Sequence, residues 1–214
     1  MGAYTLRLFD DRLPETARLT FAATPRIVYV LAGDAVVTAG NTGAPVATDH
    51  AWHGAGECSL RAGLRGATIL RYELLRGETP AADTRPPLLS HALVLDDTGE
   101  YLMRCDRVDF APGGEALPHG HKGGGIRCLI AGQLEVRVGE ASGRVMKPGD
   151  AWFETGVEPV HAIASATEPT SFIRVSILPR KIRGQSSIVY VDPAHAAVKP
   201  RRYTIFVDEP IALP

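Results

Sequence analysis

The stretch Pro118–Gly132, PHGHKGGGIRCLIAG, decides how the rest of the chain is interpreted. Two histidines one residue apart, His119 and His121, precede three glycines and a short apolar run that ends at Gly132. Side chains at i and i+2 of a strand project to the same face, so both imidazoles can reach one ligand. The alternative is a pair of exposed loop histidines beside a flexible glycine turn.

The composition is that of an ordinary globular protein. The 214 residues suffice for one large or two small domains, and the formal net charge of −1 gives no basic surface that would indicate nucleic acid or an anionic membrane. The N-terminal MGAYTLRLFDD lacks the order of a signal peptide, and no apolar run has the length of a membrane span. Because the three cysteines form no CxxC pair, we expect reduced thiols and a cytoplasmic protein.

Short β-branched runs recur along the chain, and turn residues separate them at short intervals. This pattern is typical of an all-β barrel or sandwich, and no stretch shows sustained helical periodicity. The expected strands lie at Arg26–Leu31, Ala35–Thr38, Thr68–Leu74, Ile126–Ile130, Leu134–Val138, Phe172–Leu178, Ile188–Val191 and Tyr203–Val207.

An internal repeat indicates two related halves. RIVYVLAGDAVV (26–37) resembles GIRCLIAGQLEV (125–136), and HAWHGAG (50–56) parallels DAWFETG (150–156). The offset stays near 100 residues at both places, which puts Trp52 opposite Trp152. We expect both indoles to pack inside their barrels.

The repeat and the connector define three segments. RGETPAADTRPPLLS (76–90) is polar and Pro-rich and is expected to join the halves. We predict an N-terminal barrel over residues 1–86, a C-terminal barrel over 87–180, and an extension over 181–214 whose strands cover a sheet edge.

The C-terminal half resembles the two sequence motifs of the cupin superfamily. The first is a Pro-Gly turn, an HxH pair and a later glycine; the second is a PxG turn followed by a histidine. The matching residues are Pro112-Gly113, His119, His121, Gly132, Pro148-Gly149-Asp150 and, at a looser spacing, His161. The resemblance implies two tandem cupin barrels of the jelly-roll type.

The resemblance also implies a divalent metal held by His119, His121 and His161. Imidazole ligands suit Fe, Ni, Mn, Cu and Zn, among which the sequence does not choose. The usual position of the acidic cupin ligand is Gly125 here. Glu154 either supplies the missing oxygen or is a surface glutamate near a turn.

Arg127 shares the parity of Gly125 and is expected to point into the barrel. A buried guanidinium needs a partner, because an unpaired charge is costly inside a protein. It is either a clamp for a substrate carboxylate or enolate, or half of a structural ion pair with Glu154 or Glu115. Arg174 is a second candidate of the same kind.

The N-terminal half lacks the metal pattern. Arg26 stands where the repeat would place the acidic ligand, Arg61 lies near the place of the third histidine, and no HxH precedes them. We expect a metal-free first barrel with a structural role, in which His50 and His53 are loop or structural residues.

Two functions follow from the resemblance. The first is a metal-dependent enzyme of dioxygenase type acting on a small anionic or enolic substrate, with Arg127 and Glu154 as catalytic residues. The second is a non-catalytic module that binds or senses a small molecule, with a structural or lost metal. In either case we expect a small-molecule ligand and a homodimer formed through sheet edges.

Overall fold

The computed structural model describes residues 1–77, 85–139, 142–198 and 201–214, and the regular secondary structure of these residues is almost entirely strand. The elements are β1 (Gly2–Leu13), β2 (Arg18–Phe21), β3 (Arg26–Ala39), β4 (Thr42–Ala47), β5 (His50–Gly54), β6 (Cys58–Arg76), β7 (Leu89–Leu95), β8 (Tyr101–Phe110), β9 (Glu115–His121), β10 (Gly125–Ala131), β11 (Leu134–Val138), β12 (Arg144–Met146), β13 (Ala151–Glu154), β14 (Val160–Ala164), β15 (Thr170–Pro179), the 3₁₀ helix η1 (Arg180–Ile182), β16 (Ile188–Tyr190), the 3₁₀ helix η2 (Pro193–Ala197) and β17 (Arg201–Ile211). The predicted all-β class is confirmed.

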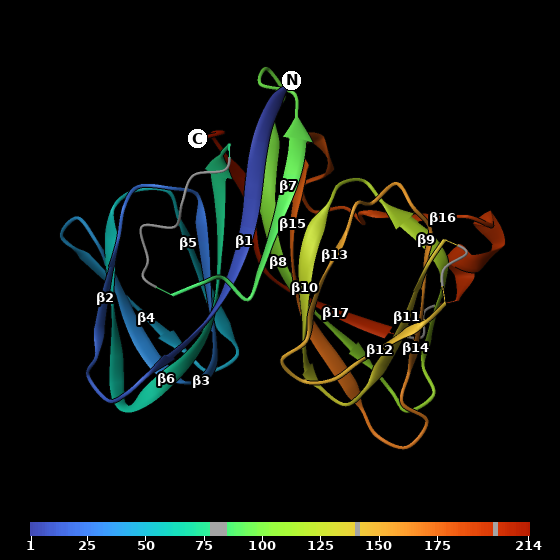
Figure 1. Cartoon of the computed structure of the whole chain (residues 1–214), viewed down its shortest axis with the longest axis horizontal. Coiled ribbons are helices and arrows are strands. Elements are labelled where there is room, and N and C mark those ends of the chain that lie inside the picture. The colour runs from blue at the N-terminus through green and yellow to red at the C-terminus, as the bar shows by residue number, and fades with distance from the viewer. Residues whose placement is uncertain (78–84, 140–141, 199–200) are drawn as a thin grey trace. The chain divides into compact units, whose positions relative to one another are not determined.

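The chain divides into two compact units (Figure 1). The first comprises Met1–Gly99 with the returning end Ile211–Pro214, and the second comprises Glu100–Pro210. In the first unit, one sheet has the strand order β4-β3-β6-β1-β7, with β2 added to β6 and β5 added to β3. Its core cluster is aliphatic, as expected for β-branched residues that alternate along strands.

The second unit is a sandwich of two five-stranded sheets, and it holds the motif residues. Their orders are β13-β10-β15-β8-β17 and β12-β11-β14-β9-β16. Inward-facing residues of both sheets, including Phe110, Leu134, Trp152 and Phe172, form its core. This layered arrangement of antiparallel strands is the jelly-roll-like barrel expected from the sequence.

The unit boundaries differ from the predicted segments at two places. β7 pairs with β1 from Gly2↔Leu95 to Leu8↔Leu89, so the first unit continues past residue 86. The predicted extension belongs to the second unit as far as Pro210, because β16 pairs with β9 and β17 adds to β8. β16 and β17 each lie at the edge of a sheet, as expected of the extension. The predicted connector at 76–90 lies partly outside the described residues.

The strand register supports the internal repeat. In the first unit Val28 lies between Trp52 on β5 and Arg71 on β6. In the second unit the equivalent residue, Arg127, lies between Trp152 on β13 and Arg174 on β15. Both tryptophans pack against their own core clusters, as predicted.

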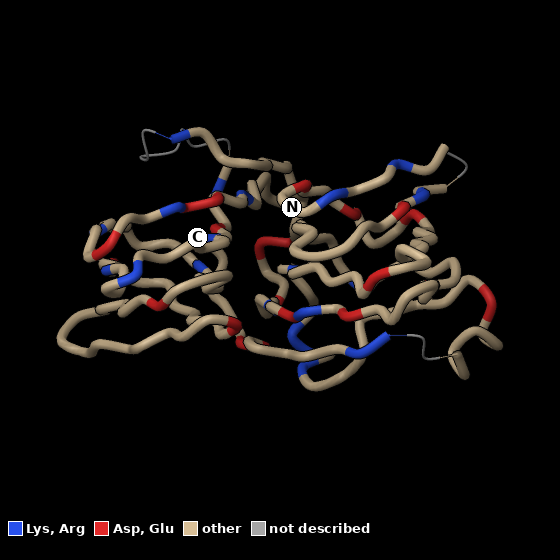
Figure 2. The backbone as a smooth tube through the Cα atoms, turned by 90° about the horizontal axis from the view of Figure 1, so that it is seen from below, with Lys and Arg blue, Asp and Glu red and all other residues tan. Residues whose placement is uncertain are grey.

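Two further observations concern the surface and the membrane. In the described part of the chain, no helix has the length and apolarity to cross a membrane. Basic and acidic positions are interspersed along the chain (Figure 2), which is consistent with the near-zero net charge.

The turn at Gly132 is tight enough to require glycine. Its φ is +70°, and a Cβ there would lie 2.4 Å from the Pro169 carbonyl oxygen. Gly139 also has a positive φ, +55°, but nothing lies within 4 Å of its Cβ position. We predict that Gly132→Ala destabilises the second unit by at least about 1 kcal/mol more than Gly139→Ala, because only the first adds a clash to the backbone strain.

Urea denaturation in a Trp52→Phe background tests this prediction. Trp152 is then the remaining tryptophan, and its fluorescence reports the second unit. Equal losses for the two alanine variants would contradict the clash at Gly132.

Candidate functional site

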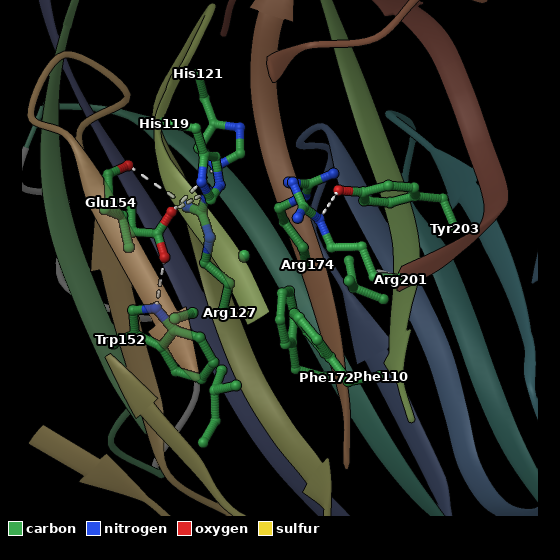
Figure 3. A pocket seen from close by; sticks show the side chains of 15 residues that line it. Phe110, His119, His121, Arg127, Trp152, Glu154, Phe172, Arg174, Arg201 and Tyr203 are labelled. Atoms are coloured by element: carbon green, nitrogen blue, oxygen red, sulfur yellow. Dashed lines mark hydrogen bonds and ion pairs between the residues drawn. The ribbon is translucent and has the colours of Figure 1, made fainter. Parts of the chain in front are cut away.

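A small cavity of about 20 Å³ lies inside the second unit (Figure 3). Apolar residues of the core form part of its wall, among them Phe110, Leu134 and Phe172. The charged and polar side chains that line it are His119, His121, Arg127, Glu154, Arg174, Arg201 and Tyr203. Figure 3 shows the first four grouped on one side and the last three on the other.

The HxH pair points into this cavity from β9. His119 is 5% exposed and His121 is 8% exposed, and their rings meet edge to face with centroids 4.9 Å apart. Strand alternation therefore places both imidazoles on one buried face, as predicted, and the loop alternative does not apply. The Nδ1 atom of His119 lies 2.7 Å from the Leu117 carbonyl oxygen. Because a carbonyl only accepts, Nδ1 carries the proton and Nε2 is left as an acceptor.

Arg127 and Glu154 form a buried ion pair beside the histidines. The Arg127 Nη2 atom lies 2.7 Å from Glu154 Oε2, and Arg127 Nη1 donates to the Gly125 carbonyl oxygen at 2.5 Å. Arg127 points inward, as its parity predicts, and of the two interpretations offered for it the structure shows the ion pair with Glu154. The interpretation of Glu154 as a surface residue is wrong: alternation on β13 buries it, with 7% of the residue exposed.

Further donors hold the Glu154 carboxylate in place. Trp152 Nε1 donates to Oε1 at 2.8 Å, and His121 Nε2 lies 3.2 Å from Oε2. Burial alone would raise the pKa of this carboxyl group. The Arg127 guanidinium and the bonds from His121 and Trp152 outweigh burial and hold the pKa well below its usual range. Glu154 is therefore ionised at neutral pH.

Both imidazoles are neutral at physiological pH. Burial lowers the pKa of His119 to about 4, against a smaller raising effect of its bond to Leu117. Burial likewise lowers the pKa of His121 to about 3; its bond to Glu154 opposes this, and the Arg127 cation adds to it. In its neutral form His121 donates through Nε2 to Glu154, so Nδ1 is an acceptor. That buried Nδ1 has no hydrogen-bond partner among the described residues.

His161 does not join the other histidines. On β14, Val160 and Ala162 face the cavity, and His161 between them faces outward. Its Nε2 lies 2.5 Å from Glu115 Oε1, and 22% of its side chain is exposed. The resemblance implies His161 as a third ligand beside His119 and His121. Strand alternation instead turns its side chain away from them.

The donor set does not fit the divalent metal that the resemblance implies. The described residues contain no group of three or more His, Cys, Asp or Glu side chains arranged to hold an ion. The carboxylate that could complete a set with His119 and His121 is already bound by the cationic Arg127. A side chain at Gly125 is excluded, because its Cβ would lie 2.4 Å from the Val175 carbonyl oxygen.

The opposite wall of the cavity carries two more arginines. Arg174 binds Asp106 through two contacts of 2.9 and 2.6 Å, and both residues are buried. Arg201 donates through Nε to the Tyr203 hydroxyl and through Nη2 to the Tyr190 hydroxyl at 3.4 Å. Burial raises the pKa of the Tyr203 hydroxyl, so this phenol is neutral at physiological pH, and Arg201 faces the cavity without a carboxylate in the described part of the chain.

Sequence reasoning identifies one side of this site and misses most of the other. Arg174 is recognised as an inward-pointing arginine. Arg201 and Tyr203 lie on β17, in the segment that has no counterpart in the first half, and β17 enters the site only through its pairing with β8. Their i, i+2 spacing at the start of a strand is the one local signal that they share a face.

The interior of the first unit is filled differently. Arg26 Nε and Arg71 Nη1 each lie 2.7 Å from Glu73 Oε1, and Arg71 Nε lies 2.7 Å from Asp11 Oδ2. All four residues are buried. Arg26, which stands where the repeat would place the acidic ligand, is thus part of a buried network of ion pairs.

Comparison with known proteins shows similarity in structure only: no family model matches the chain, and no curated protein matches its sequence. Oxalate decarboxylase from Bacillus subtilis, in its structure at pH 4.6, aligns with a TM-score of 0.64 and 13% identity over 92% of this chain and 76% of that chain. The Lactobacillus farciminis oxalate decarboxylase formate complex aligns with a TM-score of 0.66 and 15% identity, over 92% and 82% of the two chains. AerE from Microcystis aeruginosa aligns with a TM-score of 0.57 and 13% identity, over 83% and 88%. At these identities the likenesses show a shared fold, the cupin fold, and no more.

The depressed imidazole pKa values predict an acid-labile second unit. In the unfolded chain a histidine takes up its proton near pH 6.5, whereas folded His119 stays neutral to about pH 4. The unfolded state thus binds more protons between these values, so the free energy of unfolding is at its highest above pH 6.5 and falls as the pH drops. His119→Asn retains a donor for the Leu117 carbonyl and should reduce this slope by about one proton, or about 1.4 kcal/mol per pH unit.

Urea denaturation at several pH values, followed through Trp152 in the Trp52→Phe background, measures the slope. His50→Asn, at an exposed histidine of the first unit, is the matched control and should leave it unchanged. An identical slope in His119→Asn and the parent protein would refute the prediction.

Proposed function

We propose that the second unit binds a small organic monoanion that also carries a hydroxyl or enolic hydrogen-bond donor. The observation that supports this most strongly is Arg201, a cationic side chain on the cavity wall whose contacts in the described chain are phenolic hydroxyls. A cation facing a cavity in this way favours an anionic ligand, because a carboxylate would supply the charge-assisted hydrogen bonds that Arg201 lacks.

The charges around the cavity favour a single negative charge on the ligand. Arg127 is neutralised by Glu154 and Arg174 by Asp106, so Arg201 contributes a surplus of one positive charge. The histidines add none, because both are neutral at physiological pH. A monoanion balances this charge, whereas a dianion would leave one negative charge buried and unpaired.

The acceptor atoms favour a ligand that also donates a hydrogen bond. His121 Nδ1 is buried without a partner in the described chain. A second acceptor, the Nε2 atom of His119, lies on the ring next to that of His121. A hydroxyl or enolic O–H satisfies such an acceptor, and an unmet buried acceptor costs free energy. The cavity has a volume of about 20 Å³, so only a very small molecule would enter it, with movement of the lining side chains.

A binding module is favoured over the metal-dependent dioxygenase, because the donors at the site do not fit a metal and Arg127 and Glu154 neutralise each other. The structurally similar oxalate decarboxylases act on a small carboxylate, and one of them is a formate complex. At 13% and 15% identity these names guide the choice of probes and no more. Formate, acetate and glycolate are suitable monoanions, and oxalate is the matched dianion.

We predict that glycolate binds more tightly than acetate or oxalate at pH 7.5, and that Arg201→Gln weakens glycolate binding about 10-fold or more. The reason is that a hydrogen bond to a charged group contributes about 1.5–3 kcal/mol. Isothermal titration calorimetry measures both effects, and glycolamide provides an uncharged ligand of similar shape.

Arg202→Gln is the matched control. Arg202 is the next residue on β17, its side chain is 76% exposed, and it lies 3.7 Å from Asp109 outside the cavity. Its substitution should leave glycolate affinity unchanged. Equal weakening in Arg201→Gln and Arg202→Gln, or no binding of any of the anions to the parent protein, would contradict the proposal.

A further inference from the structure

Three potential metal donors converge on one wall of the cavity without forming a metal site. His121 Nε2 lies 3.2 Å from Glu154 Oε2, and the His119 ring is next to that of His121 with centroids 4.9 Å apart. All three side chains are buried and line the cavity. Two imidazoles and one carboxylate are a donor combination suited to first-row divalent ions.

The Arg127 guanidinium places a fixed positive charge against these donors. Its Nη2 lies 2.7 Å from the same Oε2 atom that His121 approaches, and only 1% of the residue is exposed. Nη1 is anchored on the Gly125 carbonyl oxygen at 2.5 Å. The guanidinium is therefore held against Glu154 by the backbone of its own strand as well as by charge.

A divalent ion cannot share this carboxylate with the guanidinium at low cost. Both would approach Oε2, and like charges at such separations repel strongly in a buried site. In addition, His121 donates its Nε2 proton to Glu154, which engages that nitrogen as well as the carboxylate. The resident arginine satisfies the negative charge that a metal would otherwise neutralise.

We propose that Arg127 takes the place of a metal ion in this barrel, and that its removal uncovers a divalent metal site formed by His119, His121 and Glu154. The wild-type protein then keeps its second barrel charge-balanced without a metal. This inference is independent of anion binding at Arg201, which the Arg201→Gln and Arg202→Gln pair tests in the presence of a chelator.

The test compares metal retention by the wild-type protein and Arg127→Met. Met is apolar and of comparable length, so it fills space without charge. Each protein is incubated with Co²⁺ or Zn²⁺ at pH 7.5, passed through a desalting column and assayed by elemental analysis, with the visible absorption of Co²⁺ as a second readout. We expect no stoichiometric retention by wild-type protein and about one ion per chain in the variant.

Two further variants assign the site. Arg127→Met/Glu154→Gln removes the carboxylate and should lose the ion, and Arg127→Lys keeps a cation beside Glu154 and should not gain one. If Arg127→Met does not fold, Arg127→Gln, which retains an amide donor for Gly125, answers the same question.

The outcomes separate clearly. Retention of about one ion per chain by Arg127→Met or Arg127→Gln, and its loss with Glu154→Gln, supports the proposal. A wild-type protein that retains an ion lost on His121→Asn substitution overturns it. So does a folded, uncharged Arg127 variant that retains no ion and gains no thermal stability from Co²⁺ or Zn²⁺.

Discussion

The buried ion pair between Arg127 and Glu154 is the interaction on which the interior of the second unit depends. Removing two charges from water is costly, and their attraction offsets that cost only when the remaining donors and acceptors are also satisfied. Trp152 and His121 supply hydrogen bonds to the carboxylate, and the Gly125 carbonyl oxygen accepts from the guanidinium. Loss of one partner would leave an uncompensated buried charge, which costs about 3–5 kcal/mol. The pair also fixes the state of the carboxylate, since Arg127 keeps Glu154 ionised; His121 is kept neutral mainly by burial, against the raising effect of its bond to Glu154.

Each of the two units buries an arginine and pairs it with a buried aspartate. Arg71 on β6 and Arg174 on β15 occupy equivalent register positions, and each binds a buried aspartate, Asp11 and Asp106 respectively. In the first unit the remaining charges, Arg26 and Glu73, are paired within the same network. In the second unit β17 brings Arg201 to the cavity without a carboxylate in the described chain. The repeat thus predicts a shared architecture, and the strand outside the repeat creates the difference in charge.

The parts of the site that sequence could predict are those governed by strand alternation within one element. His119 and His121 share a face because they are two residues apart, and Arg127 points inward by the same rule. The structure does not bring His161 to the other two histidines, because regular alternation on β14 turns Val160 and Ala162 to the cavity, while the register against β9 shifts by one residue between Ala116 and His119. Such a shift reverses the face of a side chain and leaves no mark in motif spacing. Arg201 could not be placed either, since its proximity to the histidines arises from pairing between β17 and β8.

A crystal structure of the wild-type protein grown with excess Zn²⁺ and glycolate tests most directly whether the second barrel is a metal-free anion site. The predicted result is glycolate with its carboxylate on Arg201 and its hydroxyl near the histidines, with Arg127 still bound to Glu154. The contradicting result is a zinc ion bonded to His119 and His121, with the Glu154 carboxylate turned away from Arg127 and onto the metal.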